Sequence, residues 1–226
     1  MIEKGSLYVV STPIGNLGDI TYRSVVILQQ VSLIAAEDTR RTKKLLNHYR
    51  IKTPLSSYNS YNKIKKGGHF IDCLKNGKEV ALVSDAGTPG ISDPLYHLVR
   101  SAVKEGIEVY SVPGPSAPLA ALVVSNLPVD RFAFEGFLPR KKGRKKLLKE
   151  LSEEPRTLVF FESPYRLNKT LQELYEVMGN RKIAITREMT KVHEEVIRGD
   201  LENLIVSLKN RNWKGEVTLV VQGCSG

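Results

Sequence analysis

Cysteine is scarce in this sequence of 226 residues: the two present, Cys73 and Cys224, provide neither a disulfide framework nor the spacing of a zinc site. Long apolar runs are also absent, because runs such as Leu119–Val124 are far shorter than the roughly 20 residues of a membrane-spanning helix. The first apolar run, Leu7–Val10, has only a strand's length, so we expect no export signal. These absences predict a cytoplasmic protein that holds no metal and contacts no membrane.

Several catalytic motifs are missing as well. No GxxxxGK[ST] phosphate loop occurs, which argues against a nucleoside triphosphatase, and the first glycine-rich turn lacks a complete GxGxxG. No serine lies in a GxSxG turn, and neither cysteine has neighbours that would lower its pKa, so covalent hydrolase chemistry has no support. The four histidines occur singly, without metal-ligand spacing, which favours surface or structural roles.

The charge is unevenly distributed. Against 24 Asp plus Glu the chain has 34 Lys plus Arg, a formal charge of +10. Residues 40–52 carry six cations and no anion, and residues 140–149 carry seven cations and no anion. Two such segments in an otherwise slightly acidic chain indicate a polyanionic partner, since each neutralised phosphate adds sequence-independent affinity. The alternative is that they are solvated helix faces.

Short β-branched runs alternate with helical patterns along the whole chain, which predicts an α/β protein with largely parallel sheets. The segment Pro113-Gly114-Pro115 interrupts this alternation, so we expect two α/β domains, 1–112 and 113–226. A helix is expected near Tyr22–Val31, and another after Ser163-Pro164. The expected strands are Ser6–Ser11, Leu33–Ala36, Glu79–Ser84, Ile107–Val112, Arg131–Phe134, Thr157–Phe161, Lys182–Thr186 and Glu216–Val221.

Three turns rich in Gly, Pro and small polar residues follow strands of the first domain: Thr12–Asp19, Ser84–Pro94 and Val112–Pro118. In open α/β sheets ligands bind outside the carboxyl ends of strands, where glycine lets the backbone approach closely. Each turn alone is more simply a connection between a strand and a helix. Together they predict one ligand-binding site.

Four carboxylates lie at or just beyond strand ends. Asp85 directly follows a buried strand and is suited to accept a hydrogen bond from a ligand hydroxyl or amine. Asp93 precedes Pro94 and is expected to cap a helix. Glu37 and Asp38 lie beside the first cationic segment, either as part of a capping sequence or as functional groups.

The motifs resemble a known family in order and spacing over about Leu7 to Gly223. They are LYVVSTPIGNLGDIT, AAEDTRRT, ALVSDAGTPGISDP, VPGPSA, FEGFLPRKKGR, FFESPYRL, REMTK and KGEVTLVV. This set is similar to the ribosomal RNA small subunit methyltransferase I family, within the tetrapyrrole methylase superfamily. The resemblance implies two α/β domains with S-adenosylmethionine bound between them, and a homodimer. It also implies methylation of a cytidine ribose 2′-oxygen in the decoding region of small-subunit (16S) ribosomal RNA, as naked RNA or in the 30S subunit.

The resemblance also implies a set of donor-binding residues. Related tetrapyrrole enzymes read GGDP where this chain reads SDAG, so the general role of that loop carries over better than its individual contacts. The residues expected to bind the donor are Pro13, Ser84, Asp85, Ala86, Gly87, Ile91, Ser116, Ala117 and Phe161.

A ribose hydroxyl is a poor nucleophile near neutral pH, so a nearby base or an electrostatic stabiliser should assist it. Glu37 and Asp38 are the candidates for base or substrate orienter, with Arg40 on a neighbouring phosphate. The second cationic segment is expected to contact RNA phosphates without reading bases. Those RNA-binding candidates are Arg140, Lys141, Lys142, Arg144, Lys145 and Lys146.

Two other functions compete with this one. A tetrapyrrole ring-carbon methyltransferase of the same superfamily could use the cations for an acidic macrocycle, although the missing GGDP loop and the presence of AEDTR argue against it. A non-catalytic ribosome-assembly factor fits the basic segments equally well but has little reason to keep three glycine-rich turns.

Overall fold

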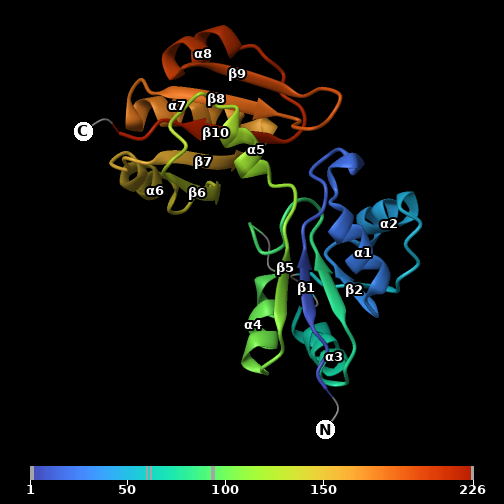
Figure 1. Ribbon diagram of the computed structural model, residues 1–226. Helices are drawn as coiled ribbons and strands as arrows, with labels where there is room; N and C mark the ends of the chain where they lie inside the picture. Colours follow the sequence, from blue (N-terminus) through green and yellow to red (C-terminus); the bar gives the residue numbers. More distant parts are fainter. Residues whose placement is uncertain (1–2, 60, 62, 93–94, 225–226) are drawn as a thin grey trace. The chain divides into compact units, whose positions relative to one another are not determined.

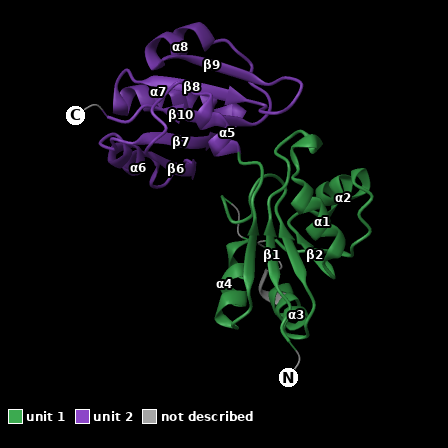
Figure 2. Cartoon of the chain, viewed as in Figure 1, with its two compact units in different colours: residues 1–116 green, residues 117–226 purple. Residues whose placement is uncertain are grey.

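The computed structural model describes residues 3–59, 61, 63–92 and 95–224, and they form two compact units, 1–116 and 117–226 (Figure 2). The sequence-based boundary after residue 112 falls at the end of the last strand of unit 1. The units divide instead between Ser116 and Ala117.

Unit 1 contains a five-stranded sheet in the order β3-β2-β4-β1-β5, in which every pair of neighbouring strands is parallel (Figure 1). Its strands are β1 (Leu7–Val10), β2 (Leu33–Ala36), β3 (Leu55–Ser57), β4 (Val80–Val83) and β5 (Val109–Val112). Its helices are α1 (Tyr22–Gln30), α2 (Thr39–His48), α3 (Lys63–Lys75) and α4 (Tyr96–Lys104), with a 3₁₀ turn η1 (Leu17–Asp19).

Alternation along the strands of unit 1 builds two cores, one on each face. In β4, Val80 and Leu82 pack against α3 and α4, whereas Ala81 and Val83 pack against α1 and α2. All four β4 residues are fully buried because helices cover both faces, as parallel sheets require. The expected strands of unit 1 and the helix near Tyr22 are confirmed. Asp93, the expected cap of α4, lies outside the described residues.

Unit 2 contains a second five-stranded sheet in the order β6-β7-β10-β8-β9. Its strands are β6 (Phe132–Phe137), β7 (Thr157–Glu162), β8 (Lys182–Arg187), β9 (Glu195–Asp200) and β10 (Val217–Val221). Its helices are α5 (Ala117–Val123), α6 (Arg144–Leu151), α7 (Leu167–Met178) and α8 (Leu201–Leu208), with a 3₁₀ turn η2 (Pro164–Arg166).

The second sheet corrects the expectation of largely parallel strands. Among its neighbouring strands only the pair β6 and β7 is parallel, whereas β10 runs antiparallel to both β7 and β8, and β8 runs antiparallel to β9. The physical reason is that the last strand of the chain inserts between β7 and β8. Helices α6, α7 and α8 pack on one face of this sheet, and α5 packs on the other.

The helix expected after Ser163-Pro164 is confirmed, with one difference at its start. The chain first forms η2, and α7 begins at Leu167, so the Ser163 side chain makes no capping hydrogen bond. Leu167, Leu171 and Leu174, which are four and three residues apart, are buried along one face of α7.

Candidate functional site

The chain changes direction between β1 and β4, which are neighbours at the centre of the first sheet. From β1 the chain passes through α1 to β2 on one side, and from β4 it passes through α4 to β5 on the other. Ligands of open α/β sheets bind at such switch points, outside the carboxyl ends of the strands. The turns that follow β1 and β4 therefore occupy the position where this fold favours a ligand.

The first and second glycine-rich turns are hydrogen-bonded to each other. Thr12 and Gly87 form an isolated antiparallel bridge, in which each backbone N–H donates to the other residue's carbonyl, over 2.9 and 3.0 Å. The Thr12 hydroxyl donates to the Ser84 carbonyl over 3.3 Å, and the Ser11 and Thr88 hydroxyls are 2.9 Å apart. These hydrogen bonds fix the two turns as one structure.

The third turn packs against the other two. A Cβ added to Gly114 would come within 3.0 Å of Ser11 Cβ, and one added to Gly87 would lie 3.4 Å from Ile14 Cγ2 and 3.6 Å from the Pro115 carbonyl oxygen. Gly87 also has a φ of +75°, which L side chains rarely adopt. Close packing therefore favours glycine at position 114 and backbone conformation favours it at position 87, and the three turns lie together as the sequence predicted.

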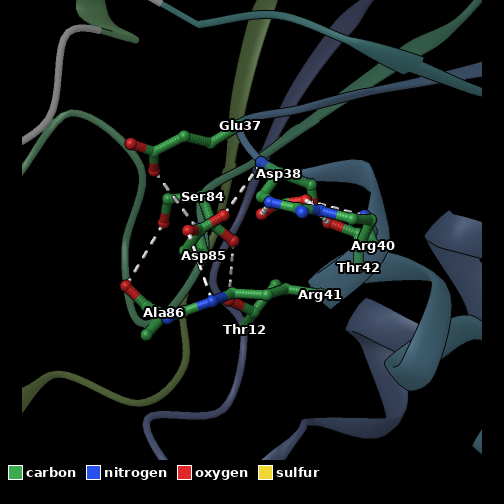
Figure 3. Close-up of polar contacts among 9 residues, drawn as sticks. All are labelled: Thr12, Glu37, Asp38, Arg40, Arg41, Thr42, Ser84, Asp85 and Ala86. Atoms are coloured by element: carbon green, nitrogen blue, oxygen red, sulfur yellow. Dashed lines mark hydrogen bonds and ion pairs between the residues drawn. The ribbon is translucent and has the colours of Figure 1, made fainter.

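Two carboxylates brace the ends of β2 and β4 against each other (Figure 3). The Asp85 carboxylate accepts a hydrogen bond from the Asp38 backbone N–H over 2.9 Å, and the Glu37 carboxylate accepts one from the Asp85 N–H over 3.4 Å. Arg41 Nε lies 3.7 Å from Asp85 Oδ2, and 27% of the Asp85 side chain remains exposed. Asp85 can therefore accept a further hydrogen bond from a ligand hydroxyl or amine.

Asp38 is the N-cap of α2. Its Oδ1 accepts a hydrogen bond from the Arg40 backbone N–H over 2.9 Å, and its two carboxylate oxygens pair with the Arg40 guanidinium at 3.0 and 2.7 Å. These bonds to Arg40, above all those from its side chain, lower the pKa of Asp38 to about 2. The capping interpretation of this segment is therefore correct for Asp38, which is a weak base in this arrangement.

Most residues expected to bind the donor lie in or beside the three joined turns. Ser84 and Gly87 are buried, Pro13, Asp85 and Ser116 are half-buried, and Ala86 and Ile91 are exposed. Ala117 begins α5 and Phe161 lies in β7, so these two belong to unit 2. The Phe161 ring contacts Phe134 and Phe137, with centroids 5.1 and 5.4 Å away.

The second cationic segment divides into exposed and buried members. Arg140, Lys141, Lys142, Lys145 and Lys146 are exposed, as a phosphate-binding role requires. The expectation for Arg144 is wrong, because only 7% of its side chain is exposed. Its guanidinium donates to Glu173 over 2.6 Å, to the Thr170 hydroxyl over 2.7 Å and to the Pro139 carbonyl over 3.2 Å.

A sequence signal for this burial exists: Arg144, Leu148 and Leu151 follow helical spacing, and all three lie on the buried face of α6. Glu162, which lies 3.8 Å from Arg144 and has a fully buried side chain, is not among the site residues predicted from the sequence. It is the last residue of a strand and precedes Ser-Pro, a pattern that by itself indicates only a strand end.

A metal site and a membrane-spanning helix are both absent from the described residues. No group of three or more His, Cys, Asp and Glu side chains among them is gathered closely enough to hold a metal ion. None of the described helices has the combined length and apolar character that spanning a bilayer requires.

Comparison with known proteins adds sequence relatives and structural neighbours. Residues 6–205 match the model of the tetrapyrrole (corrin/porphyrin) methylases. A protein of Thermotoga maritima named ribosomal RNA small subunit methyltransferase I is 53% identical over 97% of this chain and 99% of its own length. The protein of that name from Bacillus subtilis is 47% identical over 98% of this chain and 76% of its own.

The solved structures are similar in fold but distant in sequence. Diphthine synthase superposes with a TM-score of 0.75 at 15% identity, covering 96% of this chain and 90% of its own. A cobalt precorrin-4 methyltransferase superposes with a TM-score of 0.71 at 17% identity, covering 96% and 94%. At these identities the likeness establishes the fold alone.

Proposed function

The chain belongs to the ribosomal RNA small subunit methyltransferase I family of the tetrapyrrole methylases, and from that premise we propose that it methylates the ribose 2′-oxygen of a cytidine in the decoding region of small-subunit (16S) ribosomal RNA. It is a methyltransferase, and its methyl donor is S-adenosylmethionine. The observation that carries the proposal is the joining of three glycine-rich turns at the switch point of the first sheet, beside Glu37 and Asp85.

The residues at this edge fit the donor, an adenosine that carries an amino acid through a sulfonium. The joined turns offer backbone polar groups at the carboxyl ends of β1, β4 and β5, and the half-buried Asp85 offers a carboxylate for a hydroxyl or ammonium group. Ala86 and Ile91 add exposed apolar surface. When bound, the donor supplies a methyl group already activated by its positive sulfur, so the protein mainly aligns the acceptor oxygen with it.

The acceptor hydroxyl needs help because its pKa lies far above neutrality. We assign Glu37 as the base or orienter of this hydroxyl, and Asp38 as the residue that holds Arg40 near a neighbouring phosphate. The Arg40 side chain is 89% exposed and fixed by Asp38 at its inner edge, so its outer N–H groups can bind an anion. Asp38 is given the second role because its low basicity makes it a poor acceptor of the hydroxyl proton.

The substrate is recognised first through its phosphates. The exposed cations of 140–146 supply sequence-independent affinity, and ribosomal RNA or the 30S subunit is the partner they fit. A ribosomal substrate also implies action in the cytoplasm. We further propose a homodimer, on the resemblance to the family alone, which light scattering on the purified chain tests.

The test uses small subunits from cells that lack this protein, incubated with methyl-labelled donor. A 2′-O-methyl group removes the hydroxyl that attacks the neighbouring phosphodiester in alkali, so we expect the label in an alkali-resistant dinucleotide beginning with cytidine. Subunits from cells that contain the protein should take up little label. Label in alkali-sensitive nucleotides, or none in either subunit, would contradict the proposal.

Two amide variants test the base. Asp38→Asn keeps the α2 cap, since Asn caps as well as Asp, and removes the charge together with one of the two oxygens that pair with Arg40. We expect Glu37→Gln to lower turnover by about 10²-fold or more, the usual contribution of a general base, with donor affinity kept within about twofold. Asp38→Asn should mainly raise the KM for RNA. Full turnover in Glu37→Gln would remove Glu37 from the mechanism.

A porphyrinogen offered with the same labelled donor tests the tetrapyrrole alternative. We expect no transfer to it. Calorimetry with the donor tests the assembly-factor alternative, which would be favoured by an absence of binding.

A further inference from the structure

A buried carboxylate ends β7 in unit 2. The Glu162 side chain is 0% exposed, yet it accepts hydrogen bonds from the Ser163 backbone N–H and the Thr170 hydroxyl and forms an ion pair with the Arg166 guanidinium, each at 2.6 Å. Arg144 lies 3.8 Å away. A charge taken out of water is tolerated only when it is paired and hydrogen-bonded, so Glu162 keeps these four groups in place.

The two arginines beside Glu162 also bind the segment between β6 and α6. Arg166 Nη1 donates to the Leu138 carbonyl over 3.3 Å, and Arg144 Nη1 donates to the Pro139 carbonyl over 3.2 Å. The residues that follow directly are Arg140, Lys141 and Lys142, all exposed. The backbone that carries these cations is therefore anchored from the buried side.

Glu162 fixes the turn that follows it as well. Its carboxylate holds Ser163 at one end of η2 and Arg166 at the other, and the Arg166 N–H donates to the Ser163 carbonyl over 3.0 Å. Tyr165 lies within this turn, and its side chain is 93% exposed. A single exposed tyrosine is ordinary. Tyr165, however, lies in a turn that is bonded to Glu162, the same carboxylate whose two arginines hold the backbone before Arg140.

We propose that the cations of 140–142 and the Tyr165 ring form one surface for an unpaired stretch of RNA, in which Tyr165 stacks on a base and Glu162 is the positioning residue. Unpaired bases expose their faces to aromatic rings while cations follow the backbone, whereas the bases of a duplex are stacked on one another. The segment between β6 and α6 and the η2 turn are both held in place before RNA binds, so less conformational entropy is lost on binding. The inference rests on the proposed function.

The first experiment compares Tyr165→Ala with Tyr165→Phe, which keeps the ring. Affinity for unmodified small subunits is measured over a series of salt concentrations, and donor affinity is measured by calorimetry. We expect Tyr165→Ala to weaken RNA binding by about 5- to 150-fold, the range for one stacked base, with an unchanged salt slope and donor affinity. Tyr165→Phe should stay within about twofold of the original chain.

Tyr22→Ala is the matched control, because Tyr22 is 95% exposed and lies in unit 1. Unaltered RNA binding in Tyr165→Ala, or an equal loss in Tyr22→Ala, would overturn the stacking role. In either case the proposed function still stands if the original chain methylates subunits. If the original chain neither binds nor methylates subunits, both proposals fail.

The second experiment tests Glu162 with Glu162→Gln. Glu195→Gln is its control, since Glu195 also pairs with two arginines of unit 2, Arg187 and Arg211. Both variants should unfold at lower temperature, but only Glu162→Gln should raise the KM for RNA, by about tenfold, with little change in kcat. If Glu162→Gln does not fold, Arg166→Lys decides, because lysine keeps the charge and loses the bond to Leu138. An unchanged KM for RNA in the variant that folds refutes the positioning role.

Discussion

Replacing Gly87 by alanine probes the joined turns directly. Gly87 has a φ of +75°, and an added Cβ would lie 3.4 Å from Ile14 Cγ2. If the backbone keeps its conformation, alanine in the left-handed region costs about 1–2 kcal/mol. If the turn relaxes instead, the two hydrogen bonds with Thr12 break, at a net cost of about 0.5–1.5 kcal/mol each.

Both routes lead to a loss of about 1–3 kcal/mol in the free energy of unfolding. For a chain of this size that lowers the unfolding temperature of the transition that includes unit 1 by roughly 2–4 °C for each kcal/mol, which calorimetry measures. Donor affinity should fall as well when the turn relaxes. Asparagine tolerates positive φ, so Gly87→Asn should lose less stability than Gly87→Ala. An unchanged unfolding temperature and donor affinity in Gly87→Ala would refute this account of the turn.

Three further predictions concern the charged groups. In NMR spectra recorded over a series of acid pH values, Asp38 should titrate near its pKa of about 2. Its stabilising effect is therefore present above the ordinary pKa of 3.8 and is lost as pH falls through 2. Arg40→Ala should move the midpoint of the Asp38 titration back towards 3.8. Arg144→Met should destabilise unit 2 by about 2–4 kcal/mol in calorimetry, because Glu173, Thr170 and the Pro139 carbonyl each lose a hydrogen bond, whereas exposed Lys146→Met should change stability by less than about 0.5 kcal/mol. Changing the three cations at 140–142 to glutamine should reduce the salt slope of RNA binding by about 0.7–0.9 for each phosphate that they neutralise, and an unchanged slope would make that segment a solvated surface.

The expected strands of unit 1 are confirmed because burial on both faces leaves a strong signal, as in the run Val80–Val83. Two strands that were not expected have weak signals. β3 has only three residues, all half-buried, and β9, with the sequence EVIRGD, is an edge strand with few apolar residues. The antiparallel pairing of β10 could not be predicted either, since it joins residues far apart in the chain, and periodicity carries only local information.

The carboxylates and cations illustrate the same limit at the site. Local sequence was enough to suggest a capping role for Asp38, because Arg40, whose backbone N–H it bonds, lies only two positions away. The brace between Glu37 and Asp85 depends on β2 and β4 being neighbours, which the strand order decides. From the sequence, the cations around Arg144 are expected to form one exposed surface. In the structure Arg144 itself is buried.

The sequence by itself determined the family, the three turns and the two basic segments, because glycine, proline and charge act through local conformation and composition. Only the tertiary structure decided which turns bond to each other, which carboxylates brace the strand ends and which arginine is buried. Those properties arise from contacts between distant residues, and the free energy of such contacts depends on strand order and burial, which no short stretch of sequence contains.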